Sequence, residues 1–204
     1  MKTRLIGLFS LLVILLSGCQ MKDNQDFDPE AAALARMKLG LGYLANAQES
    51  EENIKLAHYN LKLAAQYSPN NPQIMLAMAM FDQHVGEYQE AEMIYQRITS
   101  MSPTNGLYRV HYGSFLCARQ RYQEAKVQFQ QSIDLDRNRW KADGFEQYGY
   151  CAIQNEDKQT ADLMFEQLFH YDTNRRESVI KTAELYQTKG DVNIANYLFS
   201  VAKK

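Results

Sequence analysis

Apolar residues follow the period of an α-helix along most of the chain after residue 30. Leu34, Met37, Leu41 and Leu44 recur at intervals of three and four, and a second series of this kind begins at Ile54. This spacing places the apolar side chains on one face of a helix. No comparable series alternates with the period of a strand. The pattern therefore predicts an all-α protein made of short amphipathic helices.

The helices belong to a repeat with a nearly constant period. Each copy has a small residue, then an aromatic residue or leucine four positions later, then a small or apolar residue three positions further on. The leading small residues are Ala57, Ala91, Ala125, Ala161 and Ala195, evenly spaced except for a slightly longer third interval. This pattern resembles the tetratricopeptide repeat, a pair of antiparallel helices. One repeat cannot bury its apolar face alone, so we expect five to stack into a solenoid.

The resemblance divides the chain into five helix-turn-helix units. They are expected near residues 32–70, 72–104, 106–139, 142–174 and 176–204, within a repeat domain of residues 30–204. In the last four units a small residue of the first helix precedes the leading alanine by a constant interval. In the first unit the interval from Gly40 to Ala57 is longer. We therefore expect an insertion of five residues in the first turn, within residues 46–53.

The N-terminus has the pattern of an export signal. Lys2 and Arg4 precede an apolar run over residues 5–16, which is too short to span a bilayer. The segment Leu16-Ser17-Gly18-Cys19 resembles the lipobox of bacterial lipoproteins. The resemblance implies a signal peptide of residues 1–18, acylation of Cys19 and a lipidated tether of residues 19–29. The alternative is an ordinary signal peptide with a chance cysteine.

The residue after the lipobox cysteine gives an expected location. In similar lipoproteins an Asp there retains the protein at the inner membrane, and this chain has Gln20. The resemblance therefore implies a protein anchored in the outer membrane and facing the periplasm.

Charge and motifs argue against several classes of function. The chain has 22 Lys and Arg against 24 Asp and Glu, a net charge of −2, which does not favour nucleic-acid binding. Its four histidines have no metal-ligand spacing, and no phosphate-binding loop or nucleophile motif is present. We expect a protein that is not an enzyme and that has no metal, cofactor or small-molecule substrate.

Two cysteines remain if Cys19 carries lipid. Exported proteins meet an oxidising compartment, which favours a disulfide between Cys117 and Cys151. Their positions in successive first helices point towards each other, but neighbouring helices lie about 8–10 Å apart and a bridge requires Cα atoms within about 7 Å. The alternative is two buried thiols that act as small hydrophobic residues.

The first helices of the repeats are expected to line the concave face. This face changes from apolar in the first repeats to acidic in the last two, where Asp143, Glu146, Tyr150, Glu177 and Glu184 follow. An exposed apolar strip is typical of a binding surface, and methionine adapts well to partners. For the first repeat the alternative is that the tether or neighbouring helices cover the leucines. The predicted partner-binding residues are Leu34, Met37, Leu41, Leu44, Leu76, Met80, Gln83, Val110 and Ser114.

One family of tetratricopeptide lipoproteins fits best. The segments Tyr112–Cys117 (YGSFLC), Gln120–Ala125 (QRYQEA) and Tyr148–Cys151 (YGYC), with Leu39–Leu44 in the first repeat, resemble the type IV pilus biogenesis and stability lipoproteins PilW and PilF. The resemblance implies a pilotin, which binds subunits of the secretin channel and promotes their localisation and multimerisation in the outer membrane. The alternative is a periplasmic scaffold for barrel assembly or peptidoglycan enzymes.

Lipidation at Cys19 is directly testable. Replacing Cys19 by Ser should abolish labelling with a radioactive fatty acid and release the protein from the membrane fraction, because the acyl chains supply the anchoring energy. Labelling that persists in the variant would show that the lipobox assignment is wrong.

Overall fold

The structure is a computed structural model that describes residues 27–135 and 139–203. The expected signal peptide, Cys19 and most of the expected tether lie outside the described residues. The described residues form ten α-helices and no strand. The helices are α2 (Pro29–Ala45), α3 (Glu51–Tyr67), α4 (Pro72–Val85), α5 (Tyr88–Met101), α6 (Gly106–Ala118), α7 (Tyr122–Ile133), α8 (Lys141–Gln154), α9 (Lys158–Tyr171), α10 (Arg175–Thr188) and α11 (Val192–Ala202).

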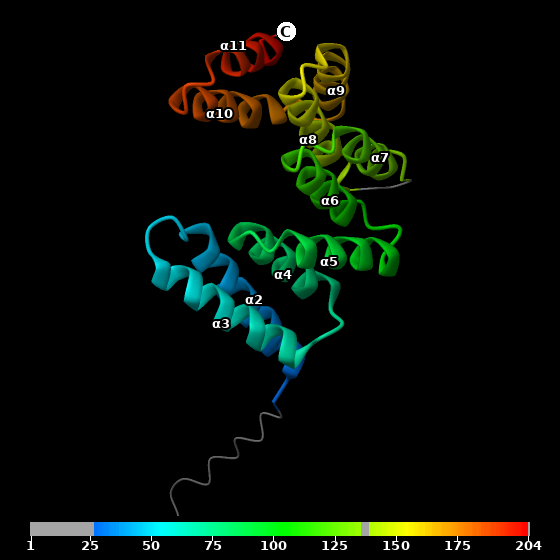
Figure 1. Ribbon diagram of the computed structural model, residues 1–204. Helices are drawn as coiled ribbons and strands as arrows, with labels where there is room; N and C mark the ends of the chain where they lie inside the picture. Colours follow the sequence, from blue (N-terminus) through cyan, green and yellow to red (C-terminus); the bar gives the residue numbers. More distant parts are fainter. Residues whose placement is uncertain (1–26, 136–138, 204) are drawn as a thin grey trace, which may run out of the picture.

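Consecutive helices pair into five antiparallel hairpins that stack in chain order. The α2–α3 hairpin lies at one end and the α10–α11 hairpin at the other, with the C-terminus beyond it (Figure 1). Each hairpin packs mainly against the hairpins before and after it, as in a solenoid. The expectation of an all-α repeat solenoid is confirmed.

Local sequence signals set the helix boundaries. Asn71 caps α4, its side chain accepting from the backbone N–H of Gln73 at 2.9 Å, and Pro72 follows at the first helical position. Gly86 ends α4 in the left-handed conformation with φ 91°, and Gly190 in the last repeat has φ 90°. Glycine takes the left-handed conformation at little steric cost, which suits both residues to the turns that follow α4 and α10.

The insertion in the first repeat lengthens both the turn and the second helix. The turn between α2 and α3 covers residues 46–50, whereas the turn between α6 and α7 covers residues 119–121. Ala57 is the seventh residue of α3, but Ala125 is only the fourth residue of α7. Two of the five extra residues thus extend the turn, and three add most of a helical turn to the start of α3.

A small residue on each first helix faces a large residue on the second helix. A Cβ atom added to Gly113 would lie 2.7 Å from Phe129 Cε1, and one added to Gly149 would lie 2.9 Å from Phe165 Cζ. Phe129 and Phe165 are fully buried against these glycines. The two helices of a repeat approach closely because the first contributes no side chain at the crossing point.

Between repeats four and five, ion pairs add to the packing. Arg175 at the start of α10 donates to Glu146 Oε2 at 2.8 Å and to Asp143 Oδ1 at 3.1 Å, both on α8. Glu146 is buried and also accepts from Ser178 Oγ at 2.8 Å. A buried carboxylate with several donors is satisfied, but it becomes costly if its cationic partner is removed.

Close packing at Gly113 predicts a sharp difference between two glycine substitutions. Gly113→Ala should lower the free energy of unfolding by about 1–3 kcal/mol, because the new methyl group overlaps the Phe129 ring. Gly42→Ala is the matched control on α2: nothing lies within 4 Å of the position that its methyl group would take, and the same change should stabilise the helix by up to about 1 kcal/mol. Urea denaturation of both variants measures the difference, and equal effects would contradict the role of the glycine.

Candidate partner-binding groove

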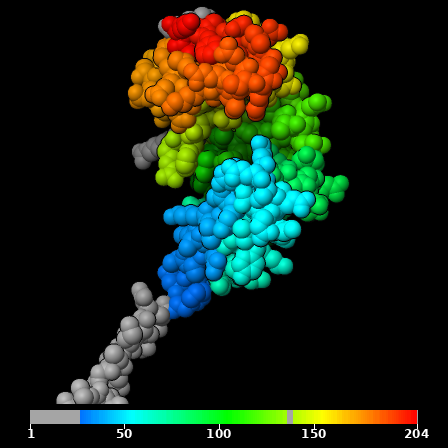
Figure 2. All heavy atoms as spheres, turned by 90° about the vertical axis from the view of Figure 1, so that its left-hand side faces the viewer, coloured from blue at the N-terminus to red at the C-terminus, as the bar shows by residue number. Residues whose placement is uncertain are grey.

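A pocket of about 460 Å³ opens on the concave side of the first three repeats. The C-terminal part of α2 contributes Leu41 and Leu44, and the C-terminal part of α4 contributes Met80 and Gln83. Ser114 from α6 completes the set of predicted groove residues in the lining. Figure 2 shows this side of the molecule, which is hollowed between the first repeat in blue and cyan and the last repeat in orange.

The pocket exists because the first helices are unevenly spaced. The backbones of α6 and α8 pack closely, whereas those of α4 and α6 do not. Side chains of Met80 and Gln83 on one helix and Ser114 on the other border the space between α4 and α6. The pocket thus depends on how repeat three stacks on repeat two.

Four of the predicted groove residues lie outside this lining. Leu76 and Val110 are buried core residues, with only 8% and 4% of their surface exposed, so their prediction as groove residues is wrong. Met37 is half-buried and packs between two small clusters inside the first two repeats. Leu34 is also half-buried, one turn before Met37 on α2. The pocket therefore uses the C-terminal halves of α2 and α4 rather than their whole length.

Sequence reasoning missed four lining residues. On α6, Val110 and His111 lie four and three residues before Ser114, so both are its neighbours on the helix surface. The structure buries Val110 and leaves His111 in the pocket lining, a choice that helical spacing alone does not make. The missed lining residues are Ala45, His84, Tyr95 and His111.

The floor of the pocket is polar but uncharged. Burial lowers the pKa of His111, which favours the neutral imidazole at pH 7. Tyr95 donates a hydrogen bond from its hydroxyl to Gln83 Oε1 at 3.1 Å, and its ring is fully buried between α4 and α5. Such a floor suits an apolar side chain with a few fixed hydrogen-bonding groups around it.

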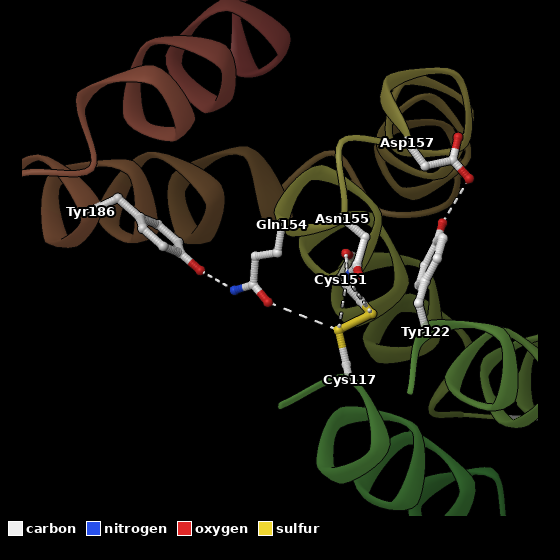
Figure 3. Close-up of a disulfide and its surroundings, with 7 residues drawn as sticks. All are labelled: Cys117, Tyr122, Cys151, Gln154, Asn155, Asp157 and Tyr186. Carbon is white, nitrogen blue, oxygen red and sulfur yellow. Dashed lines mark hydrogen bonds between the residues drawn. A yellow bond between two sulfur atoms is a disulfide. The ribbon is translucent and has the colours of Figure 1, made fainter. Parts of the chain in front are cut away.

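A disulfide lies where the groove continues towards repeat four. Cys117 on α6 and Cys151 on α8 are bonded, and their Cα atoms are 6.0 Å apart (Figure 3). Both cysteines border a smaller pocket of about 180 Å³ that shares Ser114 with the first one. Cys117 lies four residues after Gly113, as Leu44 lies four residues after Gly40. The disulfide therefore takes the place of an apolar lining residue and holds α6 against α8.

Hydrogen bonds on either side support the bridge. Tyr122 at the start of α7 donates to Asp157 Oδ2 at 2.8 Å, which joins repeats three and four, and this bond is the main cause of a lowered Asp157 pKa. Gln154 donates to the Tyr186 hydroxyl on α10 and so joins repeats four and five (Figure 3). Repeats three to five are tied together on both sides of the disulfide.

The expected acidic end of the groove is largely internal. Asp143 and Glu146 form ion pairs with Arg175, and Tyr150 is buried. Glu177 and Glu184 are exposed on α10, but Glu177 pairs with Lys181 on the same helix. The sequence pattern missed this because Arg175 belongs to the next repeat and is remote from both partners along the chain.

The described residues contain neither a candidate metal site nor a membrane-spanning helix. Within residues 27–135 and 139–203, no group of three His, Cys, Asp or Glu side chains is placed to hold a metal ion. Over the same ranges, no helix has the length and apolar character needed to cross a membrane.

Comparison with known proteins finds two relatives by sequence. No protein-family model matches the chain. An uncharacterised protein of Haemophilus influenzae is 26% identical over 163 residues, which cover 80% of this chain and 88% of that protein. The type IV pilus assembly protein PilF of Pseudomonas aeruginosa is 26% identical over 188 residues, 88% of this chain and 71% of PilF. The chain is homologous to PilF.

Solved structures support the same fold. The structure of Pseudomonas aeruginosa PilF aligns with 86% of this chain and 77% of that chain, with a TM-score of 0.64 and 22% identity. PilW, described as a widely conserved type IV pilus biogenesis factor, aligns with 84% of this chain and 76% of its own, with a TM-score of 0.63 and 17% identity. TTC0263, a tetratricopeptide protein of Thermus thermophilus, has a TM-score of 0.61 and 16% identity, covering 84% of this chain and 90% of that one. The chain thus has a tetratricopeptide fold.

The disulfide should stabilise the folded domain measurably. Replacing Cys117 and Cys151 together by Ser should lower the free energy of unfolding by roughly 3–4 kcal/mol, the loop-closure entropy for cysteines with a sequence separation of 34. Wild-type protein unfolded with a reductant should match the double variant. Thiol titration of denatured, oxidised Cys19→Ser protein from the periplasm should find no free thiol, and two free thiols would refute the bridge.

Proposed function

We propose that this protein is a lipid-anchored pilotin of the outer membrane. In this role it binds secretin subunits in the periplasm and promotes their outer-membrane localisation and multimerisation during type IV pilus biogenesis. The observation that carries the proposal is the homology to a type IV pilus assembly protein over 188 residues, 88% of this chain. The lipobox at Leu16–Cys19 supports the membrane anchor.

The groove supplies a means of binding. Leu41, Leu44 and Met80 are half-buried, so a partner that covers them removes apolar surface from water at about 25 cal/mol per Å². The methionine can adjust to the shape of the incoming side chain. Binding and escort require no catalytic step, and the proposal includes no cofactor, nucleic acid or small-molecule substrate.

The anchor supplies a means of localisation. Acyl chains on Cys19 contribute about 0.8 kcal/mol for each buried CH₂ group, and two or more chains hold a protein stably at a membrane. A secretin subunit held in the groove is then confined to the same surface as its neighbours. Confinement raises the effective concentration of subunits and so favours multimerisation.

A pull-down with a matched pair of leucine variants tests the proposal. Leu44→Ser on α2 should reduce capture of the secretin from periplasmic extract about tenfold or more, because Leu44 lines the pocket. Leu39→Ser is the control: it makes the same change on the same helix at a side chain that is 45% exposed outside the lining, and capture should be unchanged. The melting temperature of both variants is measured alongside.

The outcomes separate the interpretations. If Leu44→Ser lowers the melting temperature so far that unfolding accounts for the lost capture, Leu44 acts only as a core residue. Failure of the wild-type lipidated protein to retain the secretin, with retention of components of barrel assembly or peptidoglycan synthesis, would overturn the pilotin role in favour of another envelope scaffold.

A further inference from the structure

The edge of the solenoid beside the groove is strongly acidic in the first two repeats. Residues 46–58 and 82–90 contain the turns of these repeats and the adjoining parts of their helices. They hold six acidic residues against one lysine and two histidines. The acidic residues, which we call the acidic rim, are Glu49, Glu51, Glu52, Asp82, Glu87 and Glu90.

Two turns that carry residues of the acidic rim follow helix ends that line the apolar pocket. Ala45, which ends α2, and His84, next to the end of α4, both line the pocket. The turns that follow them carry Glu49 and Glu87, and both glutamates are exposed. In Figure 1 the α2–α3 turn projects on the side where α4 ends.

The insertion in the first repeat is what builds the longer part of the rim. Asn53 donates to the carbonyl oxygen of Asn46 at 2.7 Å, and Asn46 donates to the carbonyl oxygen of Gly42 at 2.9 Å. Ala47 is buried beneath the turn. The turn therefore has a defined conformation and presents Glu49 from a fixed position.

Negative charge accumulates along the rim, whereas in repeat three it is balanced within the fold. Burial is the main cause of a raised Asp82 pKa; the charges of Glu90 and Glu87 add to the effect, and His58 opposes it. In repeat three the corresponding turn instead carries Arg121, which binds Glu92 and Glu124, both at 2.6 Å. The acidic rim is therefore confined to the turns of repeats one and two.

We propose that the groove binds a partner segment that joins an apolar side chain to flanking lysine or arginine residues. The apolar side chain enters the pocket bordered by Leu44 and Met80, and the cationic groups meet the acidic rim of repeats one and two. This inference rests on the proposed function and adds the chemistry of the segment recognised. Complementary charge gives such a site its specificity and its rate of association more than its raw affinity.

Three short synthetic peptides of equal length test this chemistry without the secretin. All have the same central Leu, Ile and Phe side chains, and the flanks carry three Lys, three Ser or three Glu. Full-length lipidated protein in phosphatidylcholine nanodiscs is titrated by fluorescence anisotropy, with empty nanodiscs as the blank. The Lys-flanked peptide should bind about tenfold more tightly than the Glu-flanked one, and the difference should shrink as NaCl rises from about 50 to about 500 mM.

Two matched variants assign the effect to the rim. E49Q/E51Q/E52Q removes three of the six charges of the acidic rim and should weaken binding of the Lys-flanked peptide about fivefold while leaving binding of the Ser-flanked peptide unchanged. E156Q/E166Q/D191N makes the same change in net charge at exposed positions of repeats four and five that lie outside the first helices, and it should alter neither affinity. Melting temperatures report the separate contribution of Glu51 and Glu52 to the start of α3.

Equal affinity for the three peptides, or equal effects of the two triple variants, would overturn the proposal. Capture of the secretin by wild-type protein is measured separately, in the pull-down above. Retention of the secretin by E49Q/E51Q/E52Q at wild-type level would leave the pilotin role intact and refute only the charge recognition. Peptide selectivity without secretin capture would support the charge recognition and overturn the pilotin role.

Discussion

The close contact between a small residue on each first helix and a large one on the second determines the rest of the structure. At Gly113 and Gly149 the missing side chain lets a phenylalanine ring lie directly against the helix backbone. Helices packed at this distance form a rigid hairpin, because the interior is close-packed and has no room to slide. The hairpin is thus the building unit, and everything at the surface depends on how one unit stacks on the next.

Stacking is uneven along the solenoid, and the groove is the result. Repeats three and four are joined by the Cys117–Cys151 bridge, and repeats four and five by Arg175 with its two carboxylates. Between repeats two and three the backbones of α4 and α6 stay further apart, and the space between them becomes the pocket. The backbones of α8 and α10 also stay apart, so side-chain ion pairs rather than close helix packing join repeats four and five.

The first two repeats have two kinds of surface near the pocket. Half-buried Leu41, Leu44 and Met80 offer apolar area that is only partly covered by the fold. The turns beside them offer exposed carboxylates, one of them on a loop whose backbone is fixed by Asn46 and Asn53. The recognition proposed above uses both surfaces, because complementary charge adds selectivity to complementary shape.

The sequence by itself determined the fold class and the register of the repeats, and it identified part of the groove. Helical periodicity and the regularly spaced alanines are local signals, and the residue types at each position record which side chains must meet inside a hairpin. The same signals identified Leu41, Leu44, Met80, Gln83 and Ser114, because residues on the open face of a first helix recur once per repeat.

Only the tertiary structure decided which of the expected groove residues are accessible. Leu76 and Val110 lie four residues before Met80 and Ser114 and share a helix face with them, yet the packing of neighbouring helices buries Leu76 and Val110 and leaves the other two in the pocket lining. Asp143 and Glu146 are occupied by ion pairs with Arg175, which comes from a different repeat. The width of the pocket likewise depends on the separation of α4 and α6, which is a long-range property that no local pattern in the sequence encodes.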